Sequence, residues 1–171
     1  LYRYCAERGV AHRRIGKLLL AVDAEDLPML ASYAKRAAAN GVPLQSLGAV
    51  EIHRREPAVR AIAGLYSEST GILDSHGLML ALLGDAERAG ATLVTRTPVA
   101  AAHIGSDGIV VRTGGDAPLE LRCRWLVNAA GLRAQELARR IVGFPAERIP
   151  PTFYAKGHYF LLSGRAPLRQ L

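Results

Sequence analysis

Several features that define other classes of protein are missing from this 171-residue sequence. It has only two cysteines, Cys5 and Cys123, and they lie far apart, which disfavours a disulfide framework or a cysteine metal cluster. It has no apolar run of about 18 residues, and its first residues lack the charged-then-apolar order of a secretory signal. We therefore expect a cytoplasmic protein without a transmembrane segment, and peripheral contact with a membrane stays open.

The sequence also lacks the pattern of a nucleic-acid-binding protein, although its formal net charge is +7. Its lysines and arginines are scattered along the chain, without interleaved aromatic residues or a known nucleic-acid motif. The charge therefore predicts solvated faces and a mild field that attracts small anions, and no nucleic-acid partner.

Periodicity predicts alternating helices and strands in the first half of the chain. We expect a helix that ends before Gly9, strands and helices over 14–22, 25–39, 49–57 and 59–67, and a short strand at 72–73. Asp74 or Ser75 then provides an N-cap, and a helix follows that Gly90 ends.

The second half changes to a period of two. Short strands are expected at 93–94, 99–104, 109–113 and 119–125, with the last three forming an antiparallel meander. The stretch 125–131, WLVNAAG, is apolar on both faces, which is typical of a strand buried in a parallel sheet. A helix from 134 to 141 and an aromatic-rich strand or hairpin over 152–164 complete a mixed α/β chain.

Small residues follow the expected buried strand, at Asn128-Ala129-Ala130-Gly131. Ligands of open α/β sheets bind at the carboxyl edge of the strands, where small side chains let the backbone approach a cofactor. The start of the next helix would favour a phosphate there. The same residues could instead serve only tight packing of a helix on a strand.

Short strings spread along the chain resemble the L-2-hydroxyglutarate oxidase and dehydrogenase family, within the D-amino-acid-oxidase-like superfamily: GKLLLA (16–21), TGILDSHGLM (70–79), VNAAGL (127–132) and YAKGHYFLL (154–162). The resemblance implies a two-domain flavoprotein with a Rossmann-like FAD domain, an antiparallel β-meander and an interleaved substrate domain. Residues 1–68 would belong mainly to the substrate domain, 69–146 to the distal part of the FAD domain, and 147–171 to the return into the substrate domain.

The sequence departs from that family in one respect. No stretch has the G-x-G-x-x-G spacing that holds the pyrophosphate, and the C-terminal segment that returns to the flavin is absent. The chain also starts at Leu1 in place of Met. We therefore expect a central fragment that is inactive by itself, within a complete protein that binds FAD.

The resemblance also implies residues at the cofactor. The backbone of Val99 would lie along the adenine, and Ala129, Ala130 and Gly131 would border the ADP half of FAD. The alternative for the small residues is packing alone.

Three further residues are candidates for catalysis. His76 follows the expected helix cap, where an imidazole held neutral could accept a proton from a hydroxyl, or could simply face solvent or cap the helix. Lys156 and Tyr159 combine a cation and a phenol, and Lys156 could hold a carboxylate or act as a base. The alternative is a lysine on a surface hairpin.

The function implied is FAD-dependent oxidation of a small anionic 2-hydroxy acid, as in conversion of L-2-hydroxyglutarate to 2-oxoglutarate, with hydride transfer to the flavin. The sequence does not identify the electron acceptor, and it predicts no metal. Two alternatives stay open: oxidation of an amine or amino acid on the same fold, and a non-catalytic α/β interaction module.

Overall fold

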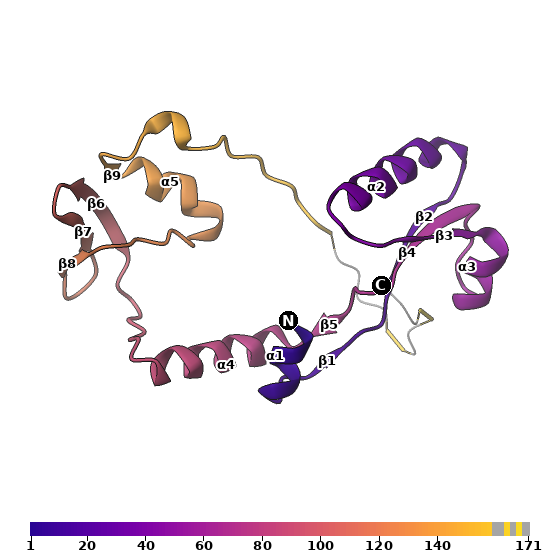
Figure 1. Ribbon diagram of the computed structural model, residues 1–171, viewed down its shortest axis with the longest axis horizontal. Coiled ribbons are helices and arrows are strands. Elements are labelled where there is room, and N and C mark those ends of the chain that lie inside the picture. Colours follow the sequence, from indigo (N-terminus) through magenta and orange to yellow (C-terminus); the bar gives the residue numbers. More distant parts are fainter. Residues whose placement is uncertain (159–162, 165–166, 169–171) are drawn as a thin grey trace. The chain divides into compact units, whose positions relative to one another are not determined.

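The computed structural model describes residues 1–158, 163–164 and 167–168. The chain forms two compact units, one built on residues 1–90 and the other on residues 91–158 (Figure 1). Each unit has its own sheet and its own buried residues. None of the described helices is both long enough and apolar enough to cross a bilayer.

The first unit is organised around a three-stranded antiparallel sheet with the order β2-β4-β3. Its strands are β2 (Lys17–Ala21), β3 (Gln45–Gly48) and β4 (Ala63–Ser67). Helix α2 (Leu27–Ala39), which follows a 3-10 turn at Ala24–Asp26, contacts β2 and β4 (Figure 1). Helix α3 (Ala49–Arg55) contacts β3 and β4 and contributes the fully buried Ile52 to the core.

A short antiparallel ribbon continues the first unit beyond this sheet. It pairs β1 (His12–Arg13) with β5 (Ile72–Leu73). Along the chain, β1 follows helix α1 (Tyr2–Glu7), and β5 precedes helix α4 (Ser75–Arg88). The two helices are joined through Asp85 of α4, whose Oδ2 accepts hydrogen bonds from the Tyr4 hydroxyl at 2.7 Å and from Arg8 Nε at 3.0 Å.

The second unit contains a four-stranded sheet with the order β8-β7-β6-β9. An antiparallel meander is formed by β6 (Val99–Gly105), β7 (Gly108–Thr113) and β8 (Glu120–Cys123), and β9 (Ile141–Val142) joins β6 in parallel. The chain between β8 and β9 contains a 3-10 turn (Gly131–Arg133) and helix α5 (Ala134–Arg139). A last 3-10 turn spans Ala146–Arg148. The core on one face consists of Ala102, Val111 and Ile141.

Most of the expected elements are confirmed. Helices α2, α3 and α4, strands β2 and β4 and the three strands of the meander lie within a few residues of their predicted positions. Helix α4 begins as expected because Asp74 Oδ1 accepts hydrogen bonds from the backbone N–H groups of His76 and Gly77, both at 3.0 Å. Cys123 is half-buried beside the core, as its inward position in the alternation predicts.

Two predicted strands, at 93–94 and 125–131, are wrong. Residues 93–94 form no strand, and 125–130 lead from β8 into the 3-10 turn without pairing. Trp125 and Val127 are 85% and 86% exposed, so the apolar run in this segment is not buried by the described chain. The physical reason is that a strand needs a neighbour, and none of the described strands pairs with either segment. Of the strand or hairpin predicted over 152–164, residues 152–158 form no strand, and the remainder lies partly outside the described residues and stays a prediction.

Candidate functional site

The segment of small residues at 128–131 is a defined turn, although it does not follow a strand. Asn128 clamps it from both sides: its Nδ2 donates to the carbonyl of Ala134 at 2.7 Å, and its Oδ1 accepts from the backbone N–H of Ala130 at 3.3 Å. Gly131 has φ +56°, in the left-handed region that other residues rarely adopt. Ala129, Ala130 and Gly131 are exposed, so the backbone here is accessible to a ligand.

A cavity of about 290 Å³ lies beside this turn, entirely within the second unit. Two of the residues expected at the cofactor line it together: Val99 at the start of β6 and Ala130 in the turn. Ala129 and Gly131, which flank Ala130 in the chain, do not line it. Its wall consists of apolar and charged side chains from β6, the turn and α5, namely Pro98, Val99, Ala130, Arg133, Glu136, Leu137 and Arg140.

The charged lining of this cavity carries an excess of positive charge. The Arg140 guanidinium pairs with the Glu136 carboxylate, so these two charges offset each other. The Arg133 guanidinium makes no hydrogen bond or ion pair within the described ranges. The cavity can therefore accept an apolar or aromatic group against Val99 and Leu137 and an anion at Arg133.

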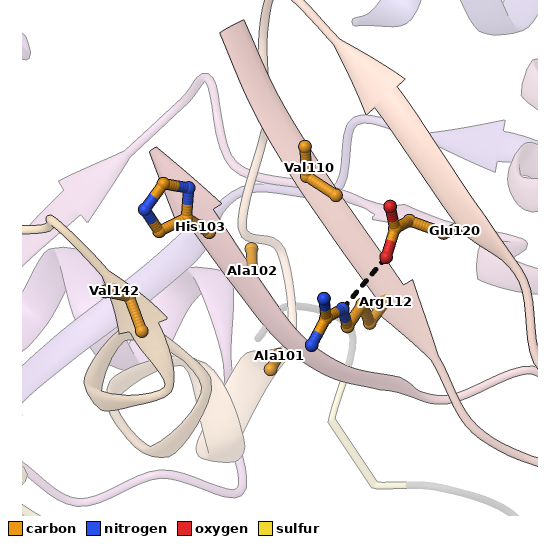
Figure 2. A pocket seen from close by; sticks show the side chains of 7 residues that line it. All are labelled: Ala101, Ala102, His103, Val110, Arg112, Glu120 and Val142. Carbon is orange, nitrogen blue, oxygen red and sulfur yellow. Dashed lines mark hydrogen bonds and ion pairs between the residues drawn. The ribbon is translucent and has the colours of Figure 1, made fainter. Parts of the chain in front are cut away.

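A second cavity, of about 320 Å³, lies on the same sheet and is lined by residues of β6 to β9 (Figure 2). Its charges are largely satisfied, because Arg112 Nε donates to Glu120 Oε2 at 2.9 Å. Figure 2 shows His103 of β6 near Val142 of β9, away from that ion pair. None of the residues predicted from the sequence lines this cavity.

The structure describes two of the three predicted catalytic residues. His76 is exposed in the first turn of α4, and its ring makes no hydrogen bond within the part of the chain that the structure describes. Lys156 is exposed in the irregular segment 151–158 of the second unit. Tyr159 lies outside the described residues. The roles of all three stay predictions.

Three residues that shape the site were not predicted from the sequence: Asn128, Arg133 and Arg140. A signal for Asn128 was present, because an Asn two positions before a small residue commonly closes an Asx-turn. Arg133 and Arg140 carried no comparable signal, because only the fold of the 3-10 turn and α5 brings them to Val99.

One known protein family matches nearly the whole chain. The family described as "FAD dependent oxidoreductase" matches residues 1–170. The match confirms the predicted enzyme class, the flavin cofactor and the D-amino-acid-oxidase-like fold.

The curated relatives are named L-2-hydroxyglutarate dehydrogenase. The mitochondrial protein of Arabidopsis thaliana is 33% identical over 98% of this chain and 41% of its own length. The human mitochondrial protein is 28% identical over 95% of this chain and 36% of its own length. The protein of Escherichia coli strain K12 is 26% identical over 94% of this chain and 37% of its own length. The chain thus spans about two-fifths of the relatives that it matches.

Solved structures support the same fold. L-proline dehydrogenase from P. horikoshii matches with a TM-score of 0.68 and 23% identity, over 81% of this chain and 37% of its own. Glycine oxidase from Geobacillus kaustophilus matches with a TM-score of 0.64 and 26% identity, over 81% and 38%. An FAD-bound L-α-glycerophosphate oxidase from Mycoplasma pneumoniae has a TM-score of 0.66 and 24% identity, over 77% and 36%.

Proposed function

Because this chain belongs to the family of FAD-dependent oxidoreductases, we propose that the full-length protein oxidises a small 2-hydroxy acid of the L-2-hydroxyglutarate type. Relatives of that name align over 94–98% of the chain, which favours a hydroxy acid over the amino acids named for two of the structural neighbours. Residues 1–68 and 147–171 would serve the substrate side and 69–146 the flavin side. The net charge of +7 favours the arrival of an anionic substrate.

The cavity beside the 128–131 turn is the proposed place for the ADP half of FAD. The observation that carries this is the shared lining of the cavity by Val99 and Ala130, which the resemblance to the family implies at the cofactor. The residues fit the group, because Ala130 leaves the backbone bare, Val99 and Leu137 offer an apolar wall, and Arg133 offers a positive charge. A volume of about 290 Å³ is at the lower end for ligand sites, so the cavity suits part of a dinucleotide.

The chemistry proposed for the substrate uses a base and a cation. FAD, when bound, would supply the acceptor for a hydride from C2 of the hydroxy acid. His76 or Lys156 would accept the hydroxyl proton, so that the C–O bond becomes the carbonyl of the 2-oxo acid. Lys156 is also the candidate cation for a substrate carboxylate, and the role of Tyr159, which lies outside the described residues, stays a prediction.

Anaerobic reduction of the flavin tests this function. The full-length protein, purified with its flavin, is mixed without oxygen with L-2-hydroxyglutarate, D-2-hydroxyglutarate, L-proline, glycine or sarcosine, and the flavin absorbance is followed. We expect bleaching with L-2-hydroxyglutarate and none with the other compounds. Bleaching by an amino acid alone would favour amine oxidation, and purification without flavin would favour the interaction module.

The placement of FAD is tested separately by filling the cavity. Ala130→Val adds a branched side chain at the lining, and overpacking of this kind costs about 1–3 kcal/mol, or about 5- to 150-fold in the Kd for FAD. Leu132→Ala is the control, because Leu132 is 78% exposed and does not line the cavity. Equal affinities of the two variants would place FAD elsewhere.

A further inference from the structure

We propose that Arg133 binds a phosphate of the FAD diphosphate, in the cavity that it shares with Val99 and Ala130. The proposal rests on the proposed function, because it takes this cavity as the site of the ADP half. It assigns an anion-binding role to a side chain within the part of the chain that the structure describes.

The turn fixes Arg133 beside the cavity. Arg133 closes the 3-10 turn Gly131–Arg133, and its backbone N–H donates to the carbonyl of Ala130 at 3.1 Å. The backbone N–H of the same Ala130 donates to Asn128 Oδ1 at 3.3 Å. The backbone that carries the guanidinium is therefore held by hydrogen bonds on both sides of the bare alanine, while the long side chain remains free to reach a ligand.

Arg133 is also the lining residue whose positive charge is not offset by a carboxylate within the described ranges. Of the two arginines in the cavity wall, Arg140 is paired with Glu136, and Arg133 has no carboxylate partner in the described ranges. A guanidinium presents parallel N–H donors that match two oxygens of a phosphate, which makes an unpaired arginine in a cavity well suited to that group. The apolar wall at Val99 and Leu137 suits the adjoining nucleoside.

Glu136 is the one lining residue that opposes an anion. Its ion pair with Arg140 offsets this repulsion at the cost of occupying the second arginine. Glu136→Gln should therefore release Arg140 toward the ligand and tighten binding of an anionic nucleotide. A cavity that binds only an uncharged group would show no such gain.

The experiment compares a charged with an uncharged nucleotide. FAD is removed from the full-length protein, and the Kd values for ADP, adenosine and FAD are measured by calorimetry. Arg133→Gln should raise the Kd for ADP by about 10- to 150-fold, the range for a charge-assisted hydrogen bond, and leave that for adenosine within twofold. Arg133→Lys should recover part of the ADP affinity, since it keeps the charge and loses the fork.

Arg139→Gln is the matched control, because Arg139 is an exposed arginine at the end of α5, the helix that follows the turn, and it does not line the cavity. It removes the same charge and should leave the ADP affinity within twofold. If Arg133→Gln and Arg139→Gln raise the Kd for ADP equally, the role of Arg133 is overturned while FAD binding stands. The same holds if Arg133→Gln raises the Kd values for ADP and adenosine equally. A wild-type protein that binds no FAD would instead overturn the proposed function, and this inference with it.

Discussion

Asn128→Ala removes both side-chain hydrogen bonds of the 128–131 turn. The bond to the Ala134 carbonyl is 2.7 Å long and that from the Ala130 N–H is 3.3 Å, so the first is the stronger. Intramolecular hydrogen bonds contribute about 1 kcal/mol each, which gives a loss of about 1–2 kcal/mol for the pair. Without the clamp the turn adopts its binding conformation for a smaller fraction of the time, and the apparent Kd rises by the inverse of that fraction.

A loss of about 1–2 kcal/mol corresponds to an increase of about 5- to 30-fold in the Kd for FAD. The assay titrates FAD into the flavin-free full-length protein and follows the quenching of flavin fluorescence, beside urea unfolding of the same samples. Asn40→Ala is the matched control, because Asn40 Nδ2 donates to the Arg36 carbonyl at 2.7 Å at the end of α2, in the other unit. It should lower stability and leave the FAD affinity within twofold. The reasoning is refuted if Asn128→Ala also loses stability with unchanged FAD affinity.

Two further predictions concern the first unit. Gly71→Ala should lower the unfolding free energy by about 1–3 kcal/mol, because the added Cβ would overlap the backbone of β1. Gly84→Ala in α4 is the control: its Cβ has room, so this change should raise the unfolding free energy by about 1 kcal/mol. Equal effects of the two changes in urea unfolding would contradict this. The Tyr4 hydroxyl, and after it Arg8, lower the pKa of Asp85, so its stabilising effect is complete above the ordinary carboxyl value and lost as the pH falls through the lowered one. The stability difference between wild type and Asp85→Asn should therefore shrink below about pH 5, and a difference unchanged down to pH 2 would show that the network does not form.

Local signals in the sequence were enough to predict the elements that are stabilised by their own neighbours. Asp74 before a helical pattern predicts the start of α4, and it caps that helix in the structure. The alternation of Leu121 and Cys123 with charged residues predicts β8, which pairs with β7 as the third strand of the meander. In these cases the cap, the turn and the partner strand all lie close by in the chain.

The segment 125–131 shows where such signals fail. An apolar run indicates burial but does not specify the partner, and Trp125 and Val127 find none in the described residues. Strand β9 was missed for the related reason that Ile141 also continues the apolar face of the preceding helix, and its pairing with Ala102 depends on a distant part of the chain. Two strand residues are too few to show a period.

The candidate site was predicted in part. Small residues and family resemblance pointed to Val99 and Ala130, which line one cavity although they are distant in sequence. Arg133 and Asn128 could not be assigned in the same way, because their roles depend on the direction of the chain through the 3-10 turn. The roles of His76, Lys156 and Tyr159 depend on a substrate and stay predictions.

The most direct test of the central claim is a crystal structure of the full-length protein with FAD bound. The account predicts that the adenosine contacts Val99 and Ala130 and that a phosphate oxygen lies within hydrogen-bond distance of the Arg133 guanidinium. An ADP half bound at another position, with the cavity beside Ala130 left open to solvent, would contradict it.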